Sequence, residues 1–425
     1  MGQPGKTFVG FGFGPIQSGL FAYEAWRSGN FARLVVAEID DALVGAVRAG
    51  GNRYAVNIAR PDRIDRATVP GVELYNPRDA RDRGAIVEAI AQADELATAL
   101  PSVNVYGAGG SAAVVQLLRE GLARRTGRAA VLYAAENHNH AAEILTEKLV
   151  QADANLAAFQ AVNTVIGKMS GILGDAREIA RLNLAPLTAG AGKAVLVEQF
   201  NRILIERIRL PGFRRGIEVF QEKPDLLPFE EAKLFGHNAI HATLAYLSEW
   251  RGLETIAQAA DDARVMAVAR EAFLGESGPA LIRRHGRLGD DLFTDAGWRN
   301  YAEDLLERMV CPNLCDRVAR VGRDHLRKLA YGDRLFGAMR LALSAGVTPR
   351  CLALGAAAGV VSLVCRQEEL PDAPECLPRA VESLDRQSLE ATLRALWAGQ
   401  ADEQAPRLID LTAEALDQLR EDRWE

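Results

Sequence analysis

The sequence predicts an α/β protein: an N-terminal parallel sheet with crossover helices over residues 1–222, followed by an all-helical C-terminal domain over residues 223–425. Three observations lead to this prediction. Short β-type runs alternate with amphipathic stretches in the first half, as in a parallel sheet. Long amphipathic patterns with few strand candidates fill the second half. Gly, Pro and charged residues cluster between residues 212 and 228, where we expect the junction.

The predicted strands of the first half are short and rich in β-branched or small apolar residues, and they span residues 6–11, 34–38, 95–100 and 129–134. Helices with apolar residues three to four apart are predicted over residues 16–28, 79–93 and 111–124. Residues 195–208 add one or two strands. In the second half, helices are predicted over residues 230–250, 253–274, 298–310, 332–345, 348–367 and 389–400.

The composition is that of an ordinary globular chain. Hydrophobic residues make up 48% of the 425 residues, which is too apolar for a disordered protein. The net charge of −6 argues against a nucleic-acid partner but allows a local basic pocket for one phosphate. The most apolar run, residues 351–365, is shorter than the ~20 residues of a membrane helix and predicts a buried core helix. Because no secretory signature is visible, we expect a cytoplasmic monomer or small homo-oligomer without a membrane partner.

A glycine-rich turn at residues 12–16 follows the first predicted strand and leads into a helix. Glycines let the backbone approach a pyrophosphate, whose charge sits on the helix N-terminus. Gln17 stands where a third glycine is usual, and a glycine turn that binds nothing is the alternative. The second predicted strand leads to an acid, Glu38, which would bind the adenosine ribose hydroxyls and repel a 2′-phosphate. The pattern predicts a Rossmann-type NAD site formed by Gly12, Gly14, Pro15, Ile16 and Glu38.

A second candidate site lies in the predicted helix of residues 230–250. At ~100° per residue, Lys233, Asn238 and His241 project within one ~140° arc. An amine, an amide and an imidazole in this arrangement could take up an alcohol proton and stabilise an oxyanion. A solvated lysine beside a satisfied core histidine explains the same residues. His237 and His241 have zinc-protease spacing, but Asn238 stands where that motif needs glutamate, so no metal site is predicted.

A third candidate follows the strand of residues 129–134. Ligands of an open parallel sheet bind beyond the carboxyl ends of the strands, so we expect polar side chains there to face the cofactor. Asn137 could donate a hydrogen bond to a substrate oxygen. His138 and His140 lack an obvious third ligand, which favours a loop-lining role over metal binding.

These residues resemble those of the polyol-specific long-chain dehydrogenases, the mannitol dehydrogenase family. The family has a lysine, then an asparagine five residues on and a histidine three further, and Lys233, Asn238 and His241 keep this spacing. Further matches are residues 11–14, residues 37–40, Glu136-Asn137 and the block of residues 320–335, which is typical of the sugar-phosphate branch. The resemblance runs from about residue 6 to about residue 361.

The resemblance implies metal-independent hydride transfer to NAD, interconverting a sugar alcohol, with a hexitol phosphate as first choice, and the corresponding ketose or ketose phosphate. It implies that Lys233 is the general base, that Asn137 and Asn238 form the oxyanion site, with Asn137 also beside the cofactor, and that His241 binds substrate hydroxyls. A substrate phosphate would need cationic donors. The natural candidates are Arg323, Arg327, Lys328 and Arg334, although surface or interdomain salt bridges explain them equally well.

The sequence departs from the family at three places: Gly167-Lys168 replaces an Asp-Arg pair, Gln17 replaces a glycine, and residues 137–140 are unusually polar. Three alternatives therefore stay open. The first is a free-polyol 2-dehydrogenase. The second is a hexuronate (tagaturonate or fructuronate) reductase, because arginine binds a carboxylate as well as a phosphate. The third is a catalytically silent NAD-binding protein.

Overall fold

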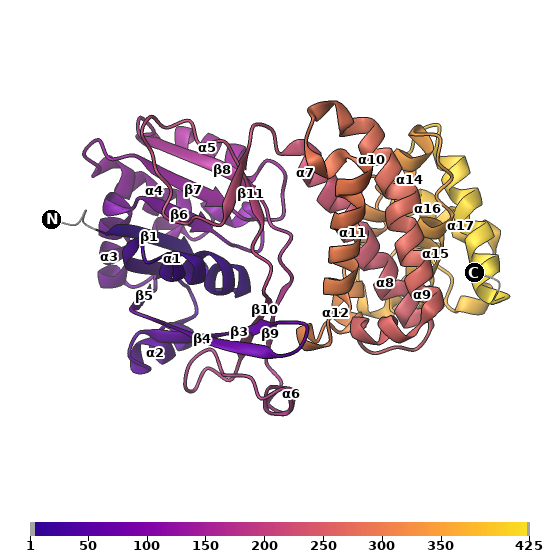
Figure 1. Ribbon diagram of the computed structural model, residues 1–425, viewed down its shortest axis with the longest axis horizontal. Helices are drawn as coiled ribbons and strands as arrows, with labels where there is room; N and C mark the ends of the chain where they lie inside the picture. The colour runs from indigo at the N-terminus through magenta and orange to yellow at the C-terminus, as the bar shows by residue number, and fades with distance from the viewer. Residues whose placement is uncertain (1–4, 423–425) are drawn as a thin grey trace. The chain divides into compact units, whose positions relative to one another are not determined.

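The structure, a computed structural model, describes residues 5–422. The chain divides into two compact units, Met1–Leu227 and Pro228–Glu425, which are described separately (Figure 1). The sequence placed the junction between residues 222 and 223. That position lies inside a strand, β12 (Phe220–Lys223), which pairs with β11 (Ile203–Glu206), so the first unit continues to Leu227.

Within the described residues, the first unit contains an eight-stranded main sheet with the order β12-β11-β8-β7-β6-β1-β2-β5. Pairing is parallel from β5 to β8, antiparallel between β8 and β11, and parallel again between β11 and β12. The chain runs outward through β1, β2 and β5, then returns to the other side of β1 with β6, β7 and β8. This reversal creates a switch point between β1 and β6, where ligands bind in open sheets. The remaining bounds are β1 (Lys6–Phe11), β2 (Phe31–Ala37), β5 (Val72–Tyr75), β6 (Glu95–Thr98), β7 (Ala130–Ala134) and β8 (Phe159–Val165).

Two buried clusters cover the two faces of the main sheet. On one face, the helices α3 (Ala80–Gln92), α4 (Val114–Ala123) and α5 (Ala141–Gln151) pack their apolar sides on the strands. On the other face lie a helix formed by Gln17–Phe21 and α1 (Ala22–Ser28), and a second sheet with the order β4-β3-β10-β9 (Figure 1). Apolar helix faces meeting both sides of a parallel sheet are the expected consequence of crossover connections.

The second sheet of the first unit was only partly predicted. Residues 195–208, expected to hold one or two strands, form β10 (Ala194–Glu198) and β11, which belong to different sheets. The hairpin of β3 (Arg53–Ala59) and β4 (Ile64–Pro70) was missed, because the exposed face of β4 carries charged and small residues that hide its alternation. The unit also holds β9 (Ser170–Leu173), α2 (Asp41–Ala49) and α6 (Ala176–Arg181).

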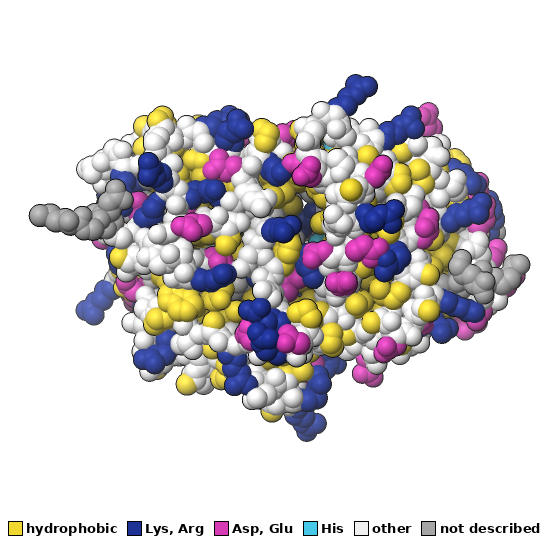
Figure 2. Space-filling view, viewed as in Figure 1, with side chains coloured by type: hydrophobic (Ala, Val, Ile, Leu, Met, Phe, Trp, Pro, Cys, Tyr) yellow, Lys and Arg dark blue, Asp and Glu magenta, His cyan; other side chains and the backbone are white. Residues whose placement is uncertain are grey.

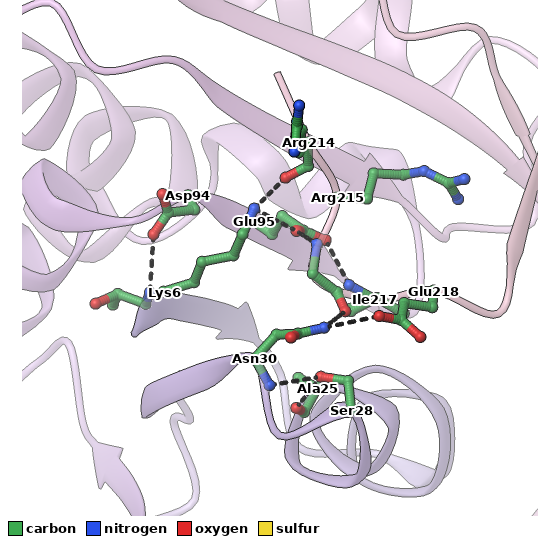
Figure 3. Close-up of polar contacts among 12 residues, drawn as sticks. Lys6, Ala25, Ser28, Asn30, Asp94, Glu95, Arg214, Arg215, Ile217 and Glu218 are labelled. Carbon is green, nitrogen blue, oxygen red and sulfur yellow. Dashed lines mark hydrogen bonds and ion pairs between the residues drawn. The ribbon is translucent and has the colours of Figure 1, made fainter. Parts of the chain in front are cut away.

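At the amino end of β6, a fully buried carboxylate fastens a loop to the sheet (Figure 3). Glu95 accepts hydrogen bonds from the backbone N–H of Gly216 and from the Tyr133 hydroxyl at 2.8 Å, and Lys6 Nζ lies 3.7 Å from its Oε1. The Asn30 side chain adds a bond of 2.8 Å to the Gly216 carbonyl. Burial raises the pKa of Glu95, and Gly216, Tyr133 and Lys6 oppose the effect. The cluster holds the connection between β11 and β12 against the main sheet.

The second unit is helical. One continuous helix begins with α7 (Leu227–Glu231), passes through a π-helical segment, Ala232–Asn238, and continues as α8 (Ala239–Trp250). The predicted core helix is confirmed as α15 (Arg350–Cys365), which packs on α8 and on α17 (Ala405–Arg420) (Figure 1). A Cβ at Gly359 would lie 2.9 Å from the Tyr246 ring, so the glycine permits this close approach of α15 and α8.

The other helices of the second unit are α9 (Ala263–Glu271), a second π-helical segment (Ala272–Ser277), α10 (Gly278–His285), α11 (Asp295–Met309), α12 (Val318–Gly322), α13 (His325–Lys328), α14 (Arg334–Ser344) and α16 (Arg386–Leu396). Between residues 5 and 422 we find no helix with the length and apolarity that crossing a membrane requires. On the face shown in Figure 2, the described acidic and basic side chains are intermixed, in keeping with the small net charge.

Candidate active site

A cavity of about 670 Å³ opens at the switch point of the main sheet, beyond the carboxyl ends of β1, β2 and β6. Its volume lies in the range of about 300–1,000 Å³ typical of ligand sites. The lining includes all five residues of the NAD site that the sequence predicted from the glycine-rich turn and the second strand, together with Ala99–Pro101 after β6. These five are Gly12, Gly14, Pro15, Ile16 and Glu38.

The first glycine of the turn is required by its backbone. Gly12 has φ of +79°, which disfavours a side chain, and a Cβ there would lie 3.0 Å from the Ala99 carbonyl oxygen. Its N–H donates to the Ala37 carbonyl at 2.8 Å, which ties the turn to the end of β2. At Gly14 a Cβ would meet nothing within 4 Å, so this glycine borders open space. The turn is therefore held tightly at its start and left uncovered where it faces the cavity.

Glu38 fixes the geometry of the turn through both carboxylate oxygens. Oε2 accepts the Phe13 N–H at 2.7 Å, while Oε1 accepts the N–H groups of Ile39 at 2.7 Å and Asp40 at 2.9 Å. Each carboxylate oxygen has two acceptor positions, so capacity remains on Oε2 for a hydroxyl donor. Such a group fits a ribose diol and repels a phosphate. Arg78, which the sequence did not single out, also lines this cavity.

Gln17 is accommodated by a glycine on the opposite strand. Its side chain is fully buried, and a Cβ at Gly10 of β1 would overlap its amide group. The third glycine of a dinucleotide fingerprint allows a close packing of helix and strand. In this chain the glycine of the contact, Gly10, lies on the strand, and the larger residue, Gln17, lies on the helix. The departure at Gln17 is thus compensated within the same contact.

Asn137 lies outside this lining. It is exposed on the turn after β7, where Ala135 is the residue that borders the cavity. The preceding Glu136 is buried and accepts hydrogen bonds from Thr98 Oγ1 at 2.8 Å, from the Leu100 N–H at 2.9 Å and from the Tyr106 hydroxyl. Glu136 therefore supports the loop after β6.

A second cavity, of about 170 Å³, lies within the helical unit. It collects two residues of the predicted helix motif and all four predicted cations, which come from separate stretches of the sequence. Five of its lining residues are basic and one is acidic. The predicted residues that line it are Asn238, His241, Arg323, Arg327, Lys328 and Arg334, and the sequence reasoning missed Arg320 as a further basic member.

Lys233 lies on the same helix but not in the lining of this cavity. Lys233 lies five residues before Asn238, and both belong to the π-helical segment Ala232–Asn238. Hydrogen bonds from residue i to i+5 bring residues five apart closer to one face than an α-helix does, and π-helical turns are frequent at functional sites. Burial, followed by the positive charge of Arg334, lowers the pKa of Lys233 to about 8, while Glu230 opposes this shift.

The cations of the cavity differ in how they are held. The Lys328 ammonium donates to the carbonyls of Val321 and Arg323, and its pKa falls to about 7 because of burial and of Arg334. Arg334 donates to Asp333 at 2.7 Å, and Arg327 to Asp324 at 3.1 Å. Arg323 is exposed and makes no ion pair with any residue of the described chain.

His241 is kept neutral by its surroundings. Burial, together with Arg320, Lys328 and Arg334, lowers its pKa to about 3. The neighbouring His237 is buried, and its pKa is lowered for the same reason. The two rings lie 6.1 Å apart. Among the described residues, no group of three or more His, Cys, Asp or Glu side chains is arranged to hold a metal ion.

Lys168, which stands where the family has an arginine, binds nearby backbone and side-chain oxygens. It is buried, and its ammonium donates to the Phe200 carbonyl at 2.8 Å, to Asn201 Oδ1 at 2.7 Å and to the Glu198 carbonyl. These acceptors lie at the last residue of β10 and directly after it, so Lys168 fixes the chain between β10 and β11.

Comparison with known proteins identifies the family. The sequence pattern of the mannitol dehydrogenase C-terminal domain matches residues 225–370. The chain is 32% identical to a mannitol-1-phosphate 5-dehydrogenase of Paenarthrobacter aurescens (strain TC1), over 81% of this chain and 83% of that relative. The chain belongs to the mannitol dehydrogenase family. The same enzyme of Halalkalibacterium halodurans is 30% identical over 75% of this chain and 80% of that relative. The predicted resemblance and the prediction of an oxidoreductase are confirmed.

Two solved structures of polyol dehydrogenases share the fold. A D-sorbitol dehydrogenase in substrate-free form superposes with a TM-score of 0.76 at 15% identity, covering 99% of this chain and 94% of that chain. Pseudomonas fluorescens mannitol 2-dehydrogenase, solved as a ternary complex with NAD and D-mannitol, gives 0.69 at 15% identity, covering 99% and 93%. The predicted fold class, a Rossmann-type sheet domain followed by a helical domain, is confirmed.

Proposed function

We propose that this chain is an NAD-dependent polyol-phosphate dehydrogenase that interconverts a hexitol phosphate, such as mannitol 1-phosphate, and the ketose phosphate. The observation that carries the proposal is the cavity of the helical unit, where an amide and a neutral imidazole share a lining with five cations. Family membership supplies the reaction class. The charge of the cavity supports the choice of a phosphorylated substrate.

The charge balance of the cavity favours a dianion. When Lys328 is protonated, the five basic lining residues carry five positive charges against three carboxylates, which leaves an excess of two. The carboxylates are Asp324 in the lining and the Asp316 and Asp333 partners of Arg320 and Arg334. A phosphate ester carries a charge of about −1.5 to −2 at neutral pH, whereas a carboxylate carries one. Arg323, with its guanidinium unpaired within the described chain, offers the fork of donors that suits a phosphate.

The cavity of the first unit fits NAD. Its glycine turn leaves backbone uncovered at Gly14, the helix that follows offers N–H groups to a pyrophosphate, and Glu38 has acceptor capacity for ribose hydroxyls. When bound, NAD supplies the hydride acceptor for oxidation of the alcohol. The role of Asn137 at the cofactor and oxyanion, expected from its place after the strand and from the resemblance, stays a prediction.

Side chains of the helical unit would accept the proton of the substrate hydroxyl and stabilise the negative charge on its oxygen. Neutral Lys233 takes the hydroxyl proton at Nζ, for which a pKa of about 8 suits a base working near neutral pH. The Asn238 amide donates to the substrate oxygen as negative charge develops, an interaction worth ~3 kcal/mol for comparable oxyanion donors. His241, held neutral, binds a further hydroxyl.

The test is an NADH-formation screen at alkaline pH over free hexitols, hexitol phosphates and hexonates. We expect turnover with hexitol phosphates alone. Turnover with hexonates alone would instead assign a hexuronate reductase, and turnover with free hexitols alone a polyol 2-dehydrogenase. Binding of NAD without turnover of any substrate would indicate a silent nucleotide-binding protein.

A pair of variants separates catalysis from folding. Lys233→Ala should abolish turnover and leave NAD affinity within about twofold, because the lysine belongs to the helical unit. Lys148→Ala on α5 is the matched control and should keep full turnover. Retained turnover in Lys233→Ala would contradict the proposed base.

A further inference from the structure

Asp316 connects two side chains of the basic cavity without lining the cavity itself. It is 4% exposed and precedes α12. Its Oδ1 accepts a hydrogen bond from Arg320, one helical turn further on. Its Oδ2 lies 3.6 Å from Nε2 of His241 on α8. Both of these facing atoms are buried, and neither has a hydrogen-bond partner within residues 5–422.

Two buried, unpaired polar atoms that face each other indicate an interaction. A buried acceptor or donor without a partner costs free energy, and a separation of 3.6 Å exceeds a hydrogen bond by only a few tenths of an ångström. Catalytic hydrogen bonds are often long in ligand-free enzymes and tighten in the substrate complex. A shift of the imidazole ring by a few tenths of an ångström toward Asp316 would give both atoms a hydrogen-bond partner.

The position of Asp316 is fixed by the backbone. Its carbonyl accepts the Ile256 N–H at 2.9 Å, and two residues later the Val318 N–H donates to the Glu254 carbonyl at 2.9 Å. The carboxylate is therefore a rigid reference point for the ring of His241. The lining of the cavity includes this ring, and because Nε2 is buried, Nδ1 is the nitrogen left for a ligand.

We propose that Asp316 is the positioning residue of His241: it accepts the proton on Nε2 in a hydrogen bond and thereby leaves Nδ1 as the acceptor for a substrate hydroxyl. The proposal rests on the proposed function for the identity of the ligand. A neutral imidazole has one donor and one acceptor nitrogen, so the partner of one nitrogen decides what the other can do. The cations Arg320, Lys328 and Arg334 oppose a second proton on this ring.

The decisive variant is Asp316→Asn. Because Arg320 has only donors, the new side-chain carbonyl would face Arg320 and the amide NH₂ would face His241. The ring would then accept at Nε2 and carry its proton on Nδ1. We expect the ¹⁵N spectrum of the histidine-labelled full chain to show His241 protonated on Nε2 in the original protein and on Nδ1 in the variant. His241→Gln assigns the signal by its disappearance.

The kinetic arm uses the same variant with the hexitol phosphate and NAD. By analogy with the hydrogen-bond partners of metal-binding histidines, the kcat/KM should fall by roughly 10- to 100-fold, with the larger change in KM. Asp262→Asn is the matched control. Asp262 also pairs with an arginine, Arg251 at 2.8 Å, and caps α9, so its variant should lower Tm and leave the His241 signal and KM unchanged.

Three results would overturn the proposal: a proton on Nδ1 of His241 in the original protein, an unshifted His241 signal in Asp316→Asn, or an unchanged KM in a folded Asp316→Asn enzyme. The measurement on the original protein needs no variant, so poor folding of Asp316→Asn leaves the test intact. If no substrate class is oxidised, the proposed function fails, and the tautomer alone then decides the pairing of Asp316 with His241.

Discussion

Gly10 and Gln17 show how a residue that breaks a motif can be matched by its neighbour. We predict that Gly10→Ala lowers the free energy of unfolding by about 1–3 kcal/mol, the usual cost of overpacking, because the new Cβ overlaps the buried Gln17 amide. Adding Gln17→Gly should restore most of this loss. Urea unfolding measures both. Gly84→Ala on α3, where a Cβ meets nothing within 4 Å, is the control and should be neutral or stabilising.

Lys233 gives a second prediction, for the pH dependence of oxidation. Only the neutral amine accepts the substrate proton, so log kcat/KM should rise with pH and level off above about pH 8, the lowered pKa of this lysine. Initial rates between pH 6 and 10 measure the profile. Since burial and Arg334 cause the shift, Arg334→Gln should move the inflection upward, and a profile that is flat from pH 6 to 10 would contradict the assignment.

At the residue scale, the sequence predicted which residues line the two cavities better than it predicted the residues that hold them in place. Asn238 and His241 were found because helical spacing is local, and the four cations because they lie in one recognisable block. Asp316 was missed because its contact with His241 joins distant parts of the chain. The role of Gly10 was invisible for the same reason: a glycine in a strand reveals nothing until the helix that it faces is known.

At the element scale, Glu276 caps the buried helix α15 from the π-helical segment Ala272–Ser277. Its carboxylate accepts the N–H groups of Cys351 at 2.6 Å and Leu352 at 2.8 Å. Burial outweighs these donors and raises its pKa to about 7. The folded state therefore holds a proton that the unfolded state releases above about pH 4.5.

We predict that this carboxyl makes the protein less stable as the pH rises from about 4.5 to 7, with a constant penalty above that range. The contribution is of the order of 3 kcal/mol from the size of the shift. Glu276→Gln should remove it, so the stability difference between pH 5 and pH 8 in urea becomes smaller than in the original protein. Glu390→Gln, an exposed pair with Arg394, is the control. An unchanged difference in Glu276→Gln would contradict the prediction.

Element boundaries show where periodicity stops being informative. The strand predicted at residues 6–11 coincides with β1, and the apolar run at residues 351–365 lies within α15. The π-helical turn at Lys233 could not be read from a period of 3.6, because its hydrogen bonds span five residues and change the direction in which Lys233 points relative to Asn238. The hairpin of β3 and β4 was hidden because β3 is buried at most of its positions and β4 carries charged and small residues, so neither strand shows a clear alternation.

At the scale of the whole molecule, a positively charged cavity is embedded in a chain of net charge −6. Burial, followed by the positive charge of Arg334, holds the pKa of Lys328 near 7, so this lysine is only partly protonated in neutral solution. A bound dianion would raise that pKa. We predict that a hexitol phosphate binds at pH 8 with uptake of up to one proton.

Calorimetric titrations in two buffers of different ionisation enthalpy measure this uptake. The free hexitol is the control ligand and should bind with little or no proton uptake. In Lys328→Met the uptake should disappear for the phosphate ester as well. Equal uptake in that variant would assign the proton to another group.

The loop fastened by Glu95 has a practical consequence for handling the protein. Lys6, near the start of the described chain, is the cation beside this buried carboxylate (Figure 3). A shortened version that begins after Lys6 would leave Glu95 without that charge and should release the connection between β11 and β12 to proteases. An N-terminal affinity tag is therefore best fused ahead of Lys6, so that this lysine is retained.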